Sequence, residues 1–243
     1  MSPNDAPPVA EIVERLVATD NLPDELHGVQ HQVEEYGGGR KETRYELWER
    51  LPNEVRTEVL SAEVVREFDF ELEIDSAPVQ ASYADGREGT TVQNERGSVV
   101  YDAEANRYRR YEYEPPDDQS GHTTDPSFVG STPQIDFDVT YEGSDTVAGR
   151  ETHVLTFRPT ADADSFTRSF DSITMWVDGA YWFPLAHEAT YQLRKEGILQ
   201  TTEEDPQNQT YFQKHTFEDV EFDIGIEDAR FQFDPPDDAE RVE

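Results

Sequence analysis

The chain has 243 residues, which is long enough for one large β domain or two small ones. Hydrophobic residues make up only 35% of it, and 54 acidic residues against 20 basic ones give a formal net charge of −34. This charge disfavours nucleic acids and anionic membrane surfaces as partners, because both attract basic proteins. The chain contains no cysteine, which excludes disulfides, thiol nucleophiles and thiolate metal sites.

The first regular element is an amphipathic helix. Apolar residues recur at i, i+3, i+4, i+7 and i+8 in Val9, Ile12, Val13, Leu16 and Val17. Asp5 is a candidate N-cap, and Pro23 marks the helix as finished. Residues 1–8 carry neither the basic nor the apolar region of a signal peptide, and we expect them to be flexible.

After the helix the period of the pattern changes to two. Phe68, Phe70, Leu72 and Ile74 alternate with five acidic residues, which predicts a strand with one buried and one solvated face. Further alternating runs are residues 45–51, 135–141, 152–157, 173–177 and 217–221. Short turn signals separate the runs, so the sequence predicts a mainly β protein of antiparallel hairpins. Two segments, 115–133 and 159–167, are rich in turn formers and are expected to be mobile loops within a single domain, 1–243.

Catalytic and metal motifs are weak. His187-Glu188 begins like a zinc-protease motif, but Tyr191 stands where the second histidine is needed. His27 and His31 have a chelating spacing only on a helix, and we expect them in a strand, about 13 Å apart. With 54 acidic residues, paired carboxylates carry no information. No metal site, cofactor or catalytic residue is therefore assigned.

The apolar faces have two interpretations. They can be packed core, or they can be the wall of a cavity that accepts an acyl chain, and periodicity does not separate the two. The candidate lipid-contacting residues are Phe68, Phe70, Leu72, Ile74, Phe137, Val139, Met175 and Val177. The candidate helical cover consists of Val9, Ile12, Val13 and Leu16.

Several short motifs, in this order, resemble one known group of proteins. They are Leu47-Trp48-Glu49-Arg50-Leu51-Pro52 with Arg56, Asp85-Gly86, Tyr101-Asp102 with Asn106, Val147-Ala148-Gly149-Arg150 with Leu155, Trp176-Val177-Asp178 with Pro184, and Phe231 with Pro235-Pro236. Together with the helix they resemble the LolA-like lipoprotein-carrier and envelope-regulator domains, which include the RseB-type sensors. The resemblance is strongest to acidic members of salt-loving archaea and covers the chain from about residue 9.

The resemblance implies a curved antiparallel half-barrel with helices over its concave face and a cavity for acyl chains. It implies a non-catalytic module that carries or senses a lipid, an acyl chain or a lipidated protein. The alternative is an RseB-type sensor that binds another protein, such as a membrane or envelope protein, and an enzyme is a third, weaker reading. The resemblance also implies an exported, envelope location, although no signal peptide, lipobox or membrane segment is found in the chain.

The charge leads to a first prediction. At a net charge of −34, self-repulsion destabilises the compact state in dilute buffer, and salt screens it because the Debye length falls to about 3 Å at 1 M. The melting temperature should therefore rise between dilute buffer and molar KCl, as measured by circular dichroism. A flat or falling melting temperature would contradict adaptation to salt.

Overall fold

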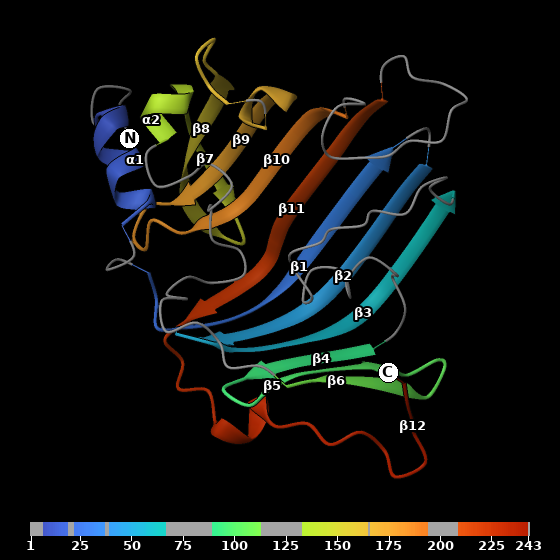
Figure 1. Cartoon of the computed structure of the whole chain (residues 1–243). Coiled ribbons are helices and arrows are strands. Elements are labelled where there is room, and N and C mark those ends of the chain that lie inside the picture. Colours follow the sequence, from blue (N-terminus) through green and yellow to red (C-terminus); the bar gives the residue numbers. More distant parts are fainter. Residues whose placement is uncertain are drawn as a thin grey trace.

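The computed structural model describes residues 7–18, 22–36, 39–66, 89–112, 133–164, 166–193 and 209–242. Strands dominate these segments, as the period-two pattern predicts (Figure 1). The helical elements are α1 (Val9–Leu16), α2 (Pro133–Asp136) and the 3-10 helices η4 (Thr167–Ser169) and η5 (Asp228–Phe231). The strands are β1 (Glu25–Tyr36), β2 (Gly39–Arg50), β3 (Glu54–Arg66), β4 (Gly89–Asn94), β5 (Gly97–Asp102), β6 (Arg107–Tyr111), β7 (Phe137–Val147), β8 (Arg150–Pro159), β9 (Phe170–Asp178), β10 (Pro184–Leu193), β11 (Gln209–Phe222) and β12 (Glu240–Arg241).

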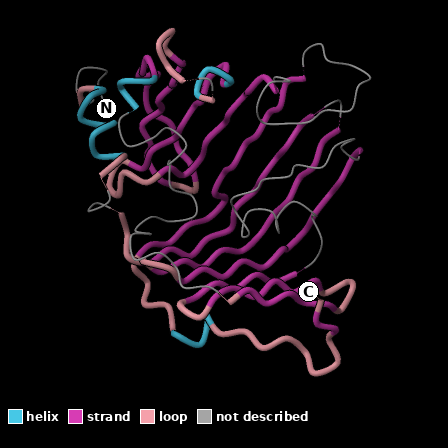
Figure 2. The backbone as a smooth tube through the Cα atoms, in the orientation of Figure 1, coloured by secondary structure: helices cyan, strands magenta, loops and turns pink. Residues whose placement is uncertain are grey.

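All the described strands belong to one sheet of 12 strands, in the order β12-β6-β5-β4-β3-β2-β1-β11-β10-β9-β8-β7. Every neighbouring pair is antiparallel except β12 with β6. The sheet is open and curved (Figure 2), with β7 as the edge strand at one end and β12, paired with β6, at the other. The mainly β, half-barrel fold expected from the sequence is confirmed.

The two faces of the sheet follow from the strand pattern. In β2 the side chains of Lys41, Thr43, Tyr45, Leu47 and Glu49 are all buried on one face. The register carries this face across the sheet, because residues that pair across strands point to the same side. We call it the inner face, since it also carries α1, and we call the opposite side the outer face.

Helix α1 covers one end of the inner face (Figure 1). Its residues Ile12, Val13 and Leu16 are at most 2% exposed. They pack with side chains of β7, β8, β9 and β10, which we call the α1 cluster: Phe137, Leu155, Phe157, Phe170, Ile173, Met175, Val177 and Ala189, together with Trp182. The amphipathic spacing read from the sequence thus places the helix as a cover of the sheet. The helix ends at Leu16, and Val17, the last residue of the predicted apolar spacing, is its C-cap.

A second apolar cluster lies on the inner face between β10, β11, β1, β2 and β3. Its members are Leu26, Tyr45, Leu47, Val55, Phe183, Leu185, Ala186, Phe217 and Val220, with Val147 from the end of β7. Gly28 is required here, because a Cβ at this position would lie 2.5 Å from the carbonyl oxygen of Asp219 and 3.0 Å from the Phe217 ring. The glycine lets the ring of Phe217 lie close against β1.

Two of the short sequence motifs meet in one ion pair. Arg150 follows the turn at Gly149, whose φ is +73°, and Asp178 ends β9. The guanidinium of Arg150 donates to both carboxylate oxygens of Asp178 at 2.6 and 3.2 Å. The same carboxylate accepts the backbone N–H groups of Ala180 and Tyr181 at 2.8 and 2.7 Å. The pair therefore fixes the β9–β10 turn to the start of β8.

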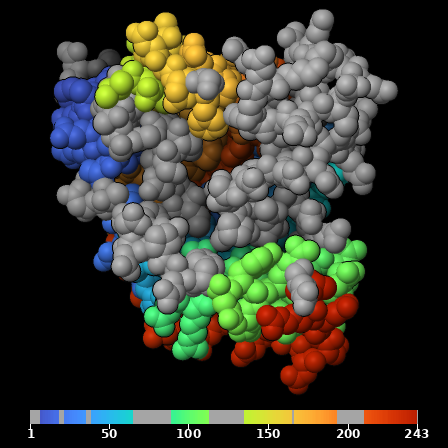
Figure 3. Space-filling model, in the orientation of Figure 1, coloured from blue at the N-terminus to red at the C-terminus, as the bar shows by residue number. Residues whose placement is uncertain are grey.

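The C-terminal segment after β11 crosses the outer face below β2 to β6 (Figure 3). Phe231 is 1% exposed and forms a small cluster with Trp48 and Ile226. Asn94 donates to the carbonyl oxygen of Phe231 at 2.9 Å, and β12 then pairs in parallel with the edge strand β6. This segment thus closes one edge of the sheet, which would otherwise offer unpaired backbone groups.

Some sequence expectations need correction. Ile135 is not part of the β7 strand face: it lies in α2 and is 70% exposed. Leu51 lies in the turn after β2, not in the strand. Asp5 does not take the N-cap position, which Pro8 occupies. The predicted strand Phe68–Ile74 lies outside the described residues, as do residues 1–6. Of the two segments expected to be loops, 115–133 is described only at Pro133, which begins α2. The other, 159–167, runs from the end of β8 to the start of η4.

Candidate functional site

The inner face changes from apolar to polar along single rows of paired residues. One row begins at Leu155 in β8 and continues through Met175, His187, His215 and Gln32. Adjacent strands lie about 4.8 Å apart, so the change from thioether to imidazole to amide takes place within about 10–15 Å. In this row the inner face is therefore apolar under α1 and polar on β10, β11 and β1, although the same strands carry apolar side chains of the second cluster further along, such as Leu26 and Phe217.

We call the polar part of this face the polar band. Its members are Glu34, His187, Tyr191, Tyr211, Gln213 and His215. The histidine and tyrosine rings of the band stack in pairs across β10 and β11. The ring centroids of His187 and His215 are 4.5 Å apart with an interplanar angle of 18°, and those of Tyr191 and Tyr211 are 4.9 Å apart with an angle of 24°. Aromatic pairs on one sheet face stabilise the register of β10 and β11.

Hydrogen bonds connect the members of the polar band. The hydroxyl of Tyr191 donates to Oε1 of Gln213 at 2.7 Å, and Nε2 of Gln213 donates to Nε2 of His215 at 2.6 Å. The hydroxyl of Tyr211 donates to the carboxylate of Glu34. Such a network holds its side chains in fixed orientations, because breaking one bond leaves a polar group without its partner in a low-dielectric setting.

Burial keeps the titratable rings of the polar band neutral. It lowers the pKa of His187 to about 4, and it lowers the pKa of His215 well below its usual value, with a further contribution from His187. Burial also raises the pKa of Tyr191 and of Tyr211, with a smaller contribution from Glu34. At neutral pH all four rings are uncharged hydrogen-bonding groups.

The candidate lipid-contacting residues have different environments. Phe137, Met175 and Val177 are at most 3% exposed and belong to the α1 cluster, and Val139 packs against it half-buried. A ligand would reach the three buried side chains only if residues packed over them moved. Phe68, Phe70, Leu72 and Ile74 lie outside the described residues. Of the candidate helical cover, Ile12, Val13 and Leu16 belong to the α1 cluster and Val9 packs against it half-buried.

Sequence reasoning missed the polar band. Its residues alternate with others in β10 and β11, but their polarity hid them among solvent-facing positions. The signal that was available is the pair of tyrosines, Tyr191 and Tyr211, because aromatic residues are enriched in strands. His27 and His31 lie in β1, as expected, and each contacts a carboxylate of β2 on the outer face.

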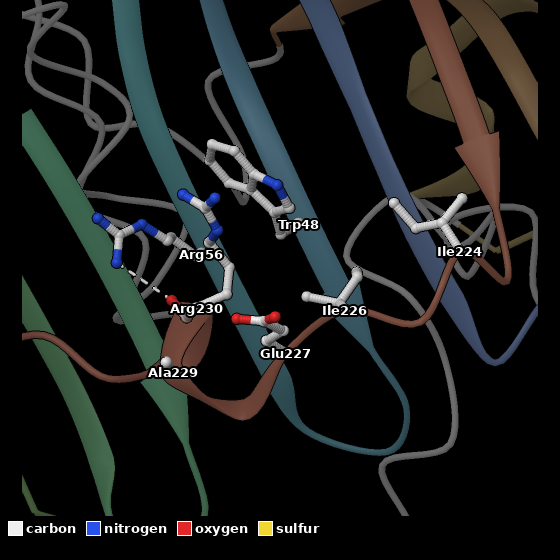
Figure 4. Close-up of a pocket in the computed structure, with 7 residues that line it drawn as sticks. All are labelled: Trp48, Arg56, Ile224, Ile226, Glu227, Ala229 and Arg230. Atoms are coloured by element: carbon white, nitrogen blue, oxygen red, sulfur yellow. Dashed lines mark hydrogen bonds between the residues drawn. The ribbon is translucent and has the colours of Figure 1, made fainter.

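The outer face carries a hollow of about 320 Å³ where the C-terminal segment crosses β2 and β3 (Figure 4). The residues that line it are Trp48, Arg56, Ile224, Ile226, Glu227, Ala229 and Arg230. The guanidinium of Arg230 lies 4.5 Å from the centre of the Trp48 ring, and Arg56 donates to the carbonyl oxygen of Arg230 at 3.1 Å. Ile224 is 47% exposed, so the hollow presents an aliphatic, an aromatic and a cationic group together.

The described residues offer neither a metal site nor a membrane-spanning helix. Within the described segments, no three His, Asp or Glu side chains are grouped so that they could hold a metal ion. Among the helices of these same segments, none has the length and apolar character needed to cross a membrane.

Comparisons with known proteins bear on the fold. Neither protein-family models nor curated protein sequences match the chain. Solved structures do match. MucB in complex with MucA(peri) is 15% identical with a TM-score of 0.50, covering 97% of this chain and 62% of MucB. The Pseudomonas aeruginosa MucA/MucB complex gives 16% identity and a TM-score of 0.49, covering 93% of this chain and 60% of the other.

A LolA superfamily protein from Nitrosomonas europaea also matches, at 11% identity and a TM-score of 0.35, with 94% of this chain and 99% of the other covered. The match at a TM-score of 0.50 shows that the chain has the fold of MucB, in agreement with the resemblance drawn from the sequence motifs. It spans about 60% of the length of the MucB chains.

The neutral histidines lead to a prediction on pH. In the unfolded chain His187 takes up its proton near pH 6.5, but in the folded protein only near pH 4. As the pH falls between these values the unfolded state binds more protons, so the free energy of unfolding should fall. In His187→Gln this loss should be smaller, as measured by denaturant unfolding from pH 8 to pH 4 at constant high salt.

Tyr191→Phe is the control, since it removes a hydroxyl of the polar band and keeps both histidines. It should lower stability at all pH values and leave the slope against pH unchanged. Identical slopes in the native protein and His187→Gln would show that this histidine is not held neutral by burial.

Proposed function

We propose that the chain is a non-catalytic binding module that holds a lipid, an acyl chain or a lipidated protein on the inner face of its half-barrel. The observation that carries the proposal is the contrast between the apolar surface under α1 and the small helix that covers it. Leu155, Phe157, Ile173, Met175 and Val177 form a continuous apolar floor. Burying an acyl chain there would contribute about 0.8 kcal/mol for each CH₂ group.

The cover is small. Helix α1 has eight residues and is therefore about 12 Å long. Isolated helices of fewer than about 12 residues are marginal in water, so α1 depends on its contacts with the sheet. Those contacts are mainly three side chains, Ile12, Val13 and Leu16, with Arg15 lying 4.5 Å from the ring centre of Trp182. A ligand that displaces α1 would take over the apolar floor that these side chains bury.

The proposal predicts that weakening the cover strengthens binding. Leu16→Ala should reduce the docking of α1 by about 2–5 kcal/mol. If α1 and the ligand compete for the same floor, the weaker docking lowers the free energy that ligand binding must supply to displace α1. The affinity for a fluorescent fatty-acid ester, titrated in molar KCl, should then rise by about ten-fold.

Leu26→Ala is the matched control, because Leu26 is 0% exposed in the second apolar cluster and does not contact α1. It should lower stability to a similar extent and leave the affinity unchanged. An affinity that is unchanged or reduced in Leu16→Ala, or no saturable binding in either protein, would contradict the proposal.

A second candidate function is that of a regulator that binds another protein. The outer hollow favours it, because tryptophan and arginine around a small concavity are typical of interface hot spots. One structure with this fold was solved as a complex of MucB with MucA(peri).

This second function predicts that Ile224→Asp abolishes binding of a partner protein. Leu60→Asp is the control and should leave that binding intact, because Leu60 is exposed to a similar extent, 45% against 47%, but does not line the hollow. Equal effects of the two substitutions on the binding of a purified partner would show that the hollow is not the binding site.

A further inference from the structure

The polar band adjoins the apolar floor directly, in one row of the sheet. Met175, in the floor, pairs with His187, and His187 pairs with His215. Two strand spacings amount to about 10 Å, which is the length of a head group and the first carbons of an attached chain. A ligand whose chain lies on the apolar floor would therefore place its polar end on β10 and β11.

The polar band has hydrogen-bonding capacity beyond its internal bonds. The amide nitrogen of Gln213 carries two hydrogens and its oxygen two lone pairs, of which the contacts with His215 and Tyr191 use one each. The carboxylate of Glu34 can accept further bonds besides the one from Tyr211. The network holds these donors and acceptors in fixed orientations, so hydroxyl or ester groups that reach the polar band would meet them already oriented.

The charge of this surface disfavours an anion. The four rings of the polar band are neutral at pH 7, because burial lowers the pKa of His187 and of His215 and raises that of Tyr191 and of Tyr211. Among the described inner-face residues of β9, β10, β11, β1 and β2, Lys41 is the one lysine or arginine, and it lies opposite Glu34. Lys41 makes an interaction of its own, and the chain as a whole carries −34.

On the basis of the proposed function, we infer that the ligand is a lipid with an uncharged, hydroxyl- or ester-bearing head group, and that the polar band, with Gln213 at its centre, binds that head group. An anionic lipid would have to give up its hydration on a surface that offers no unpaired cation among these strands. An uncharged head group would exchange hydrogen bonds with water for hydrogen bonds with the amide, imidazole and carboxylate groups.

The test compares two probes that share one fluorescent acyl chain: the free fatty acid and its monoglyceride, titrated at pH 8 in molar KCl. The intact chain should bind the monoglyceride at least about ten-fold more tightly than the acid, a difference of about 1.4 kcal/mol. Gln213→Met should abolish this preference by weakening the monoglyceride. Gln192→Met is the control, because Gln192 bonds to Asp171 on an exposed part of the neighbouring strand; it should keep the preference.

The outcomes separate this inference from the proposed function. Equal affinities of the intact chain for acid and monoglyceride would overturn the inference and leave lipid binding in place. This comparison needs no variant, so it holds even if Gln213→Met fails to fold. A preference that survives in a folded Gln213→Met would also overturn the role of the polar band. Binding of neither probe would remove both the proposed function and the inference.

Discussion

The docking of α1 on the inner face is the contact on which the rest of the account depends. A curved sheet of 12 strands has a large concave surface, and an eight-residue helix can cover only one end of it. Ile12, Val13 and Leu16 close the apolar floor over β8 and β9. Beyond the helix, the described strands carry the second apolar cluster and, next to the floor, the polar band. The boundary between floor and polar band runs between β9 and β10, where Met175 pairs with His187.

This arrangement gives each structural part a separate task. The second apolar cluster and the Arg150–Asp178 pair hold the strands and the β9–β10 turn together. The C-terminal segment closes the β6 edge and packs on the outer face through Phe231. Neither contributes to the floor under α1, so that floor can change its cover without loss of the frame. This division is what a carrier of apolar cargo needs, since binding must not compete with folding.

Much of the fold could be predicted from the sequence. The spacing from Val9 to Leu16 indicated a helix, and the runs around residues 152–157 and 173–177 indicated strands, because one buried face imposes a regular period. The candidate site was less accessible. The periodicity around Met175 and Val177 fits both a packed core and a cavity wall. The structure shows that both side chains pack in the cluster that includes α1, which the sequence pattern could not reveal. His187 and His215 lie 28 residues apart in sequence (215 − 187), and only the register brings their rings together.

The central claim is that α1 opens independently of the sheet and that a lipid takes its place. Hydrogen–deuterium exchange in molar KCl, read by mass spectrometry on peptides from α1 and from β8 and β9, tests it most directly. The account predicts that α1 exchanges far faster than the two strands, and that adding a monoglyceride speeds α1 further while β8 and β9 stay protected. Protection of α1 equal to that of the strands, unchanged by lipid, would contradict it and leave the helix as ordinary core.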